Sequence, residues 1–294
     1  KAGERIAIVG ESGSGKTLTG LSIMGLLPEG ANITGEINCQ INQKSQNLLA
    51  LSEVEMRSIR GKDIAMIFQD PMSALHPYYK IGDQLAEAYL VHNPGKKKEA
   101  AARAVEMLDL VGISEPAQRA KEFPHQFSGG MRQRVMIAMA LINNPKILIA
   151  DEPTTALDVT VQAQILELLR DLQKEFGLAF VFIAHDLAVV RHFAQRVAVM
   201  YLGNLVEIAD RDTLYTNPKH PYTKALLSAV PEADPDAVGA RERIRLTGDV
   251  PNPINPPSGC RFRTRCWKAQ DKCRTTEPAL VQIGASQVAC HFPD

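Results

Sequence analysis

One octapeptide near the start of the chain constrains the fold more than any other feature. Residues 10–17 read GESGSGKT and fit the pattern G-x-x-x-x-G-K-[ST]. They follow a short β-branched run, residues 5–10, and precede an apolar stretch that reaches Leu27. The backbone amides of such a loop, together with the N-terminus of the following helix, can bind an anionic phosphate. The sequence therefore predicts a strand, a phosphate-binding loop and a helix; the alternative is a glycine-rich turn without a ligand.

The side chains in and around this loop suit a nucleotide and its metal ion. Lys16 would add positive charge between the outer phosphates, and the Thr17 hydroxyl would ligate Mg²⁺. Asp151 and Glu152 follow a second apolar run, at the sheet edge where open α/β folds bind ligands. We expect Asp151 to hold Mg²⁺ through water and Glu152 to polarise the attacking water, unless the pair only caps the next helix. The candidate phosphate-binding residues are Gly10, Ser12, Gly13, Ser14, Gly15, Lys16 and Thr17.

The remaining pattern predicts an α/β core with inserted helices. Apolar runs at 146–151 and 178–185 enclose a stretch with helical spacing, which Gly177 can cap, so that a parallel sheet is expected. Residues 197–210 predict an antiparallel hairpin that turns at Gly203-Asn204. Helices are also expected at 84–92, 97–111, 220–230 and 236–246. The expected divisions are 1–70, the first part of the core; 71–144, a helical subdomain; 145–210, the second part of the core; and 211–294, a C-terminal extension.

Charge and hydropathy exclude some classes of function. Lysine plus arginine equals aspartate plus glutamate at 33 each, which disfavours nucleic acid as the main ligand. No apolar run approaches the roughly 20 residues that cross a bilayer. The first residues lack the pattern of a signal peptide, and the chain is expected to be truncated at its start. Five cysteines in a chain without an export signal favour a reduced compartment, in which clustered thiols are more often metal ligands than disulfides.

A second segment predicts a helix that begins where an anion could bind. Residues 127–142 read FSGGMRQRVMIAMALI. Ser128 can cap the helix, while Gly129 and Gly130 let the backbone approach a ligand closely and the helix dipole favours negative charge. Taken alone, the segment is better explained as a capped, buried helix.

Together these segments resemble the nucleotide-binding subunit of an ABC transporter. This resemblance covers residues 1 to about 230 and implies a P-loop, RecA-like ATPase core with antiparallel edge strands and an inserted helical subdomain. It also implies two subunits packed head to tail, with each ATP held between the Walker A loop of one and the signature of the other. The matching motifs are, in order, GESGSGKT (Walker A), IFQDP at 67–71 (Q-loop), FSGGM at 127–131 (signature), ILIADE at 147–152 (Walker B), TALD at 155–158 (D-loop) and IAHD at 183–186 (H-loop).

The resemblance implies roles for single residues outside the loop. Gln69 would touch Mg²⁺ or water and relay the nucleotide state to a membrane partner, His185 would contact the γ-phosphate, and Asp158 would bridge to the opposing subunit. Their plain alternatives are a surface glutamine, a histidine hydrogen-bonded at a strand end and a helix cap. The expected catalytic residues are Glu152, His185 and Gln69, and Ser128, Gly129 and Gly130 would act on the ATP of the partner subunit.

The sequence departs from the family pattern in two places. Phe127 and Met131 stand where the family has Leu and Gln, which weakens the assignment of the signature residues between them. Only nine residues precede Gly10, so no adenine-stacking residue can be assigned.

Longer stretches, among them NPKHPYTKALLSAVP, resemble the ATPase subunits of bacterial dipeptide and oligopeptide importers, a group that includes nickel and glutathione importers. The resemblance implies that ATP hydrolysis drives peptide import at the cytoplasmic face of the cell membrane. The implied partners are a second, related ATPase subunit, two transmembrane permease subunits and an extracytoplasmic peptide-binding protein. A nucleic-acid-associated ABC ATPase is the competing class, favoured by a basic tail but opposed by the neutral net charge.

Four of the five cysteines lie in that tail. Their spacing differs from the C-x₂-C pairs of structural zinc sites, yet four thiolates on a loop can hold either zinc or a [4Fe–4S] cluster. The peptide-importer resemblance implies the iron–sulfur cluster; zinc, disulfides and free thiols are the alternatives. Cys39 is expected to be an ordinary strand residue. The expected ligands are Cys260, Cys266, Cys273 and Cys290.

Overall fold

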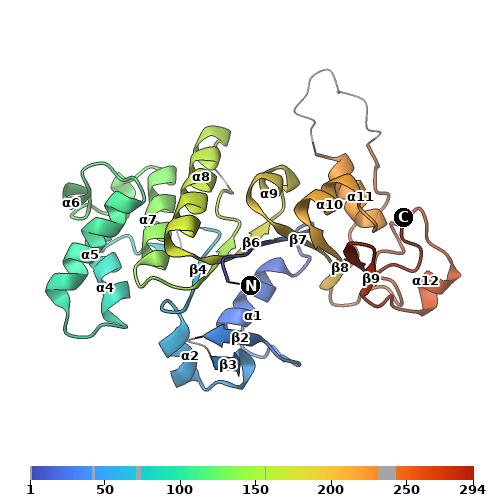
Figure 1. Cartoon of the computed structure of the whole chain (residues 1–294), viewed down its shortest axis with the longest axis horizontal. Coiled ribbons are helices and arrows are strands. Elements are labelled where there is room, and N and C mark those ends of the chain that lie inside the picture. The colour runs from blue at the N-terminus through green and yellow to red at the C-terminus, as the bar shows by residue number, and fades with distance from the viewer. Residues whose placement is uncertain (1, 42–43, 71–73, 156, 231–242) are drawn as a thin grey trace. The chain divides into compact units, whose positions relative to one another are not determined.

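The computed structural model describes residues 2–41, 44–70, 74–155, 157–230 and 243–294. They form two compact units, one of residues 1–4 and 19–181 and the other of residues 5–18 and 182–294. Figure 1 shows their helices and strands, most of them labelled. Most of the helix expected at 236–246 lies outside the described residues, as do Pro71 of the Q-loop and Ala156 of the D-loop.

The first unit contains parallel strands. Strand β4 (Ile64–Ile67) pairs with β5 (Ile147–Asp151), and Ile64 stands opposite Ile147. Helix α8 (Val159–Phe176) follows β5 and ends at Gly177, whose φ of 63° is the left-handed cap that the sequence predicts. Strand β6 (Ala179–Ala184) comes next. The predicted strand–helix–strand unit is confirmed, whereas β4 was not predicted, because its four buried residues are too short a run to show a period.

The predicted helical subdomain is present in the same unit (Figure 1). Helix α4 packs on α5 and α7, α5 also packs on α6 and α7, and α7 contacts β4. Leu85, Met107, Leu108 and Ile137 are fully buried between these helices. The helices are α4 (Ile81–Leu90), α5 (Lys97–Leu110), α6 (Pro116–Arg119) and α7 (Gly129–Leu141), with a 3₁₀ turn η2 (Pro124–Gln126) before α7.

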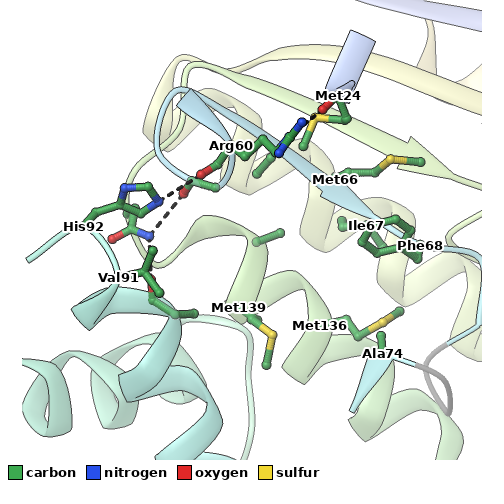
Figure 2. Close-up of a pocket in the computed structure, with 15 residues that line it drawn as sticks. Met24, Arg60, Met66, Ile67, Phe68, Ala74, Val91, His92, Met136 and Met139 are labelled. Carbon is green, nitrogen blue, oxygen red and sulfur yellow. Dashed lines mark hydrogen bonds between the residues drawn. The ribbon is translucent and has the colours of Figure 1, made fainter. Parts of the chain in front are cut away.

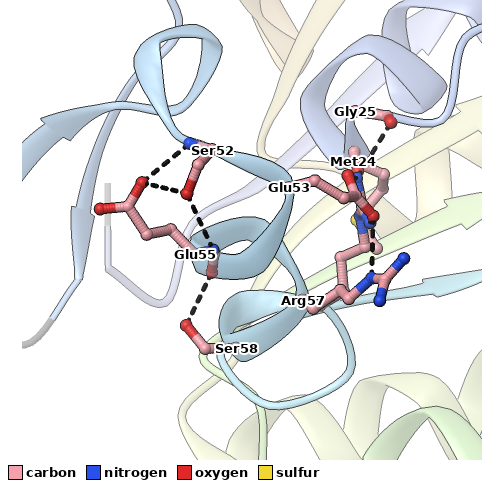
Figure 3. Close-up of polar contacts among 8 residues, drawn as sticks. Met24, Gly25, Ser52, Glu53, Glu55, Arg57 and Ser58 are labelled. Carbon is pink, nitrogen blue, oxygen red and sulfur yellow. Dashed lines mark hydrogen bonds and ion pairs between the residues drawn. The ribbon is translucent and has the colours of Figure 1, made fainter.

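Smaller elements complete the first unit. Strands β2 (Asn38–Ile41) and β3 (Lys44–Asn47) form an antiparallel pair that contains Cys39, as expected. A 3₁₀ turn η1 (Leu48–Ala50) leads to α2 (Glu53–Ile59), which opens with a capping box. In it the Glu55 carboxylate accepts from Ser52 N at 2.8 Å (Figure 3).

Arg60, at the end of α2, holds the C-terminus of helix α1 (Lys16–Met24). Its Nε donates to Met24 O at 2.6 Å and its Nη2 donates to Gly25 O at 3.0 Å. The guanidinium also pairs with Glu53 at 2.7 Å. Figure 3 shows Glu53 beside Met24 and Gly25. Because the last carbonyls of a helix lack partners within it, this cation satisfies two acceptors that would otherwise remain open.

The second unit combines parallel and antiparallel pairing. Strand β1 (Arg5–Val9) is parallel to β7 (Arg196–Tyr201), which is antiparallel to β8 (Asn204–Asp210). The predicted hairpin is confirmed, but its turn is Leu202–Gly203, with φ of 45° and 82°. Placing the turn at Gly203-Asn204 was therefore wrong by one residue. A two-residue hairpin turn of this kind needs positive φ at both positions, and here a leucine adopts it.

The C-terminal extension belongs to this unit and is more ordered than the sequence suggests. Strand β10 (Ser286–Val288) pairs with β8, and β9 (Val281–Ile283) pairs with β10. Neither strand was predicted, since three residues carry no recognisable alternation. The helices of the unit are α9 (Leu187–Phe193), α10 (Arg211–Thr216), α11 (Pro221–Ser228) and α12 (Asp271–Thr275).

An aromatic cluster forms the core of the extension. Tyr201 lies 4.8 Å from Tyr222 and 5.1 Å from Phe262, measured between ring centroids, and all three side chains are buried. His220, which caps α11 through its Nδ1, is buried against Phe262. Burial lowers the pKa of His220 to about 3. Across the described parts of the chain, no helix is both long enough and apolar enough to cross a membrane.

Candidate nucleotide site

The phosphate-binding loop leaves β1 in the second unit and leads into α1. Gly13 and Gly15 have φ of 77° and 95°, a region that favours glycine. A Cβ on Gly10 would lie 2.2 Å from the Met200 carbonyl oxygen, so only glycine fits against β7 there. Gly203 N donates to Ser14 O at 2.9 Å and fixes the loop to the hairpin turn. The loop is thus fixed against β7 and the hairpin turn that follows it.

Lys16 points back over this loop. The residue is 5% exposed, and its ammonium donates to the carbonyl oxygens of Gly10 at 2.9 Å and Glu11 at 3.0 Å. The Ser14 hydroxyl is buried and has no hydrogen-bond partner among the described residues. Ser12, Gly13 and Thr17 are exposed. A buried cation, an unpartnered hydroxyl and exposed backbone at a helix N-terminus together suit a phosphate group.

The first unit contains the candidate carboxylates. Asp151 ends β5 and is 2% exposed, and Glu152 follows with φ of 46°. A non-glycine residue in this region costs about 1 kcal/mol or more, so its surroundings must hold it. Gln69 Nε2 donates to the Glu152 carboxylate at 3.2 Å, and Thr155 Oγ1 donates to it at 2.9 Å. Gln69 and Glu152 are therefore brought together, and Thr155 is a contact that sequence reasoning missed, although it opens the TALD match.

The signature residues begin α7 in the same unit. Ser128 is exposed, and its Oγ accepts from Met131 N at 3.3 Å, so the predicted cap is confirmed. Gly129 is also exposed. A Cβ on Gly130 would lie 2.8 Å from Val161 Cγ1, which explains the glycine by the close packing of α7 on α8. The exposed helix N-terminus is available to an anion from outside the unit.

Asp158 lies at the start of a helix and His185 at the end of a strand. Asp158 caps α8, and its Oδ1 accepts from Val161 N at 3.0 Å. His185 directly follows β6 in the second unit and is exposed. Neither observation tests the role that the resemblance implies, because a helix cap can also face a partner subunit and an exposed histidine can also face a phosphate.

The predicted metal site of the tail is not formed in the described part of the chain. All five cysteines are free, and no group of three or more His, Cys, Asp or Glu side chains in the described ranges is placed to hold a metal ion. Burial and, after it, the charge of neighbouring thiolates raise the pKa of Cys290 to about 11 and also raise the pKa of Cys260 and Cys266. A bound metal ion would have to displace these thiol protons. Because the side chains are not placed together, the expectation of a bound [4Fe–4S] cluster or zinc ion on Cys260, Cys266, Cys273 and Cys290 is not supported.

Comparisons with known proteins identify the class. The family profile described as "ABC transporter" matches residues 1–155. A dimeric post-hydrolysis state of the ATP-binding cassette MJ0796 with ADP and Pi has a TM-score of 0.61 and 31% identity, covering 72% of this chain and 87% of that one. CbiO1 of Clostridium perfringens, part of an ABC transporter complex, has a TM-score of 0.60 and 27% identity, covering 74% and 81%. The chain belongs to the ABC transporter family, and it is an ATPase with the P-loop cassette fold.

Within that family the chain is similar to one group over nearly its whole length. The oligopeptide transport ATP-binding protein AppD of Bacillus subtilis is 51% identical, covering 95% of this chain and 84% of that protein. The dipeptide transport ATP-binding protein DppD of Escherichia coli is 48% identical, covering 100% and 88%. A second profile, "Oligopeptide/dipeptide transporter, C-terminal region", matches residues 206–273.

Proposed function

We propose that this chain is the ATP-hydrolysing subunit that powers the import of dipeptides or oligopeptides. The observation that carries the proposal is the near full-length similarity to peptide transport ATP-binding proteins, which extends into residues 206–273 beyond the ATPase core. A cassette alone would support only ATP hydrolysis. The match to the C-terminal region of peptide transporters adds the solute class.

The proposed chemistry assigns one task to each group. The loop amides and Lys16 bind the phosphates, and Thr17 and Asp151 supply the oxygen ligands for Mg²⁺, which neutralises phosphate charge when bound. Glu152 accepts a proton from the attacking water, and His185 donates a hydrogen bond to the γ-phosphate. The Gln69–Glu152 hydrogen bond of 3.2 Å supports a link between the Q-loop and this base.

We further propose a dimer of two ATPase subunits, the second of them a related chain. In it, Ser128, Gly129 and Gly130 act on the ATP bound to the partner, and Asp158 faces the partner. The exposed N-terminus of α7 supports this assignment, because a helix N-terminus presents backbone N–H groups and a favourable dipole to an anion. The remaining partners are two permease subunits and, through them, an extracytoplasmic peptide-binding protein.

A pocket of about 580 Å³ in the first unit is the proposed docking site for a short helix of a permease subunit (Figure 2). Four methionines line it, and methionine surfaces adapt to the apolar face of a helix. Phe68 and Val91 at the pocket are 40% and 68% exposed. Because Phe68 precedes Gln69, a bound helix would act on the Q-loop and thereby on Glu152. The methionines are Met24, Met66, Met136 and Met139.

This docking is tested with two matched substitutions. Val91→Asp places a charge at the pocket, whereas Val54→Asp places one on α2, where Val54 is 77% exposed and does not line the pocket. Co-purification with the permease subunits should be lost only in Val91→Asp, while both variants keep basal ATP hydrolysis. Retention of the permeases by Val91→Asp would contradict the docking site.

The transported solute is tested by uptake in cells. Disruption of the gene should abolish ATP-dependent uptake of labelled dipeptides or oligopeptides, and the intact gene should restore it, while the Glu152→Gln form should not. Loss of nickel or glutathione uptake, with peptide uptake unchanged, would move the chain to another solute of the same importer group. Salt-dependent binding of DNA or RNA with no change in any uptake would contradict import altogether.

The iron–sulfur part of the proposal is separate. It rests on the peptide-importer resemblance and on the grouping of Cys260, Cys266, Cys273 and Cys290 in the tail. Binding would displace thiol protons, so the affinity should rise with pH. Metal analysis and the visible spectrum of anaerobically purified protein decide among [4Fe–4S], zinc and free thiols.

A further inference from the structure

The second residue of the phosphate-binding loop, Glu11, is paired with an arginine of the cysteine-rich tail. Arg265 Nη1 lies 2.6 Å from Glu11 Oε2, and Nη2 lies 3.2 Å from Oε1, across 254 positions of sequence. The side chains are 8% and 29% exposed, respectively, so the pair is largely shielded from water. A two-point contact of this kind fixes orientation as well as charge.

Both partners also contact tyrosines of the aromatic cluster in the second unit. The Arg265 guanidinium lies over the Tyr201 ring, 6.0 Å from its centroid. The Tyr222 hydroxyl accepts a hydrogen bond from Glu11 N at 2.9 Å. Glu11 is therefore fixed through its backbone by α11 and through its carboxylate by the tail.

The charge of Glu11 has a direct consequence for the bound substrate. A carboxylate in a loop that binds a triphosphate places like charges near each other, which opposes binding. Arg265 neutralises that carboxylate and pulls it toward the aromatic cluster. Lys16 donates to the backbone carbonyl of the same residue at 3.0 Å.

We propose that Arg265 is a positioning residue for ATP: by pairing with Glu11 it neutralises the negative charge of that carboxylate in the phosphate-binding loop, so that the tail controls nucleotide affinity. The arginine does not touch the substrate in this scheme. It acts by donating two hydrogen bonds to the Glu11 carboxylate, which neutralise the charge of that group.

The test is a double-mutant cycle with equilibrium binding of the fluorescent analogue trinitrophenyl-ATP to the full chain. Arg265→Ala leaves Glu11 unpaired and should weaken binding about tenfold, an effect that shrinks at high salt. Glu11→Gln in the same background removes the unpaired charge and should restore the affinity to within about threefold of the parent. Arg263→Ala is the matched control, because the Arg263 side chain donates to Ser258, outside the phosphate-binding loop, and its loss should leave the affinity unchanged.

The outcomes separate positioning from support of the fold. If Arg265→Ala binds the analogue as the parent does, the proposal is overturned. It is equally overturned if the double variant binds as weakly as Arg265→Ala, since the arginine would then only stabilise the tail. Glu11→Gln alone keeps the test valid if Arg265→Ala does not fold: it should bind at least as tightly as the parent, and weaker binding contradicts the proposal.

Discussion

Acid should destabilise the second unit through a single buried imidazole. His220 is 1% exposed, its Nδ1 accepts from Tyr222 N at 3.0 Å, and burial lowers its pKa to about 3. In the unfolded chain a histidine titrates near 6.5. Between these two values the unfolded state binds a proton that the native state does not. The free energy of unfolding therefore falls as pH falls below about 6.5, and this contribution is fully present only above that pH.

The size of the loss in stability follows from the interval between the folded and unfolded pKa values of His220. One proton of difference changes the free energy of unfolding by about 1.4 kcal/mol per pH unit, so that lowering the pH from 6.5 to 5 should cost about 2 kcal/mol. Glu207, which accepts from His220 N at 2.9 Å, works in the opposite sense. Burial raises its pKa, so its contribution is lost as pH rises through the folded value.

The assay uses the single tryptophan of the chain, Trp267, which lies in the second unit. Urea unfolding followed by its fluorescence between pH 5 and 8 should show the loss in the parent. His220→Asn keeps an acceptor at the cap but does not titrate, so its curve should be flatter by about 1.4 kcal/mol per pH unit below pH 6.5. Equal slopes for the two proteins would refute a buried, neutral His220.

Two further predictions concern the loop that precedes α1 and the C-terminus of this helix. Gly10→Ala should weaken ATP binding more than tenfold, because its Cβ would meet Met200 O at 2.2 Å; Gly13→Ala meets nothing within 4 Å and should cost only the roughly 1 kcal/mol of its positive φ. Equilibrium binding of the ATP analogue compares them, and equal losses would contradict the contact. Arg60→Ala should lower stability by about 1–3 kcal/mol by leaving the Met24 carbonyl and its neighbour without a donor. The midpoint of thermal unfolding measures this loss of stability, and an unchanged midpoint would contradict a stabilising role for the Arg60 cap.

Local chemistry made much of the fold predictable from sequence. The loop 10–17, the cap at Ser128 and the left-handed Gly177 are each set by residues within a few positions, so their structures follow from the sequence around them. The α8 pattern is long enough to show a helical period. By contrast, β4, β9 and β10 have three or four residues each and are defined by the strands they pair with.

The types of residue in the site could be predicted from the sequence, whereas the contacts that hold these residues could not. The motif matches named Gln69 and Glu152, but their contact and the pairing of Glu11 with Arg265 depend on how distant segments fold together. The contact of Thr155 with Glu152 is local, across three positions. The cysteine spacing allowed several outcomes. Whether four thiols converge on one centre depends on backbone placement and thiol pKa, which spacing does not determine.

The most direct test of the account is ATP hydrolysis by the Glu152→Gln variant, beside Glu175→Gln on the exposed surface of α8 as the control. If Glu152 activates the attacking water, the variant should bind ATP within a few-fold of the parent and hydrolyse it at least about 100-fold more slowly. Glu175→Gln should behave as the parent does. Hydrolysis at the parental rate by Glu152→Gln would contradict the catalytic assignment on which the account depends.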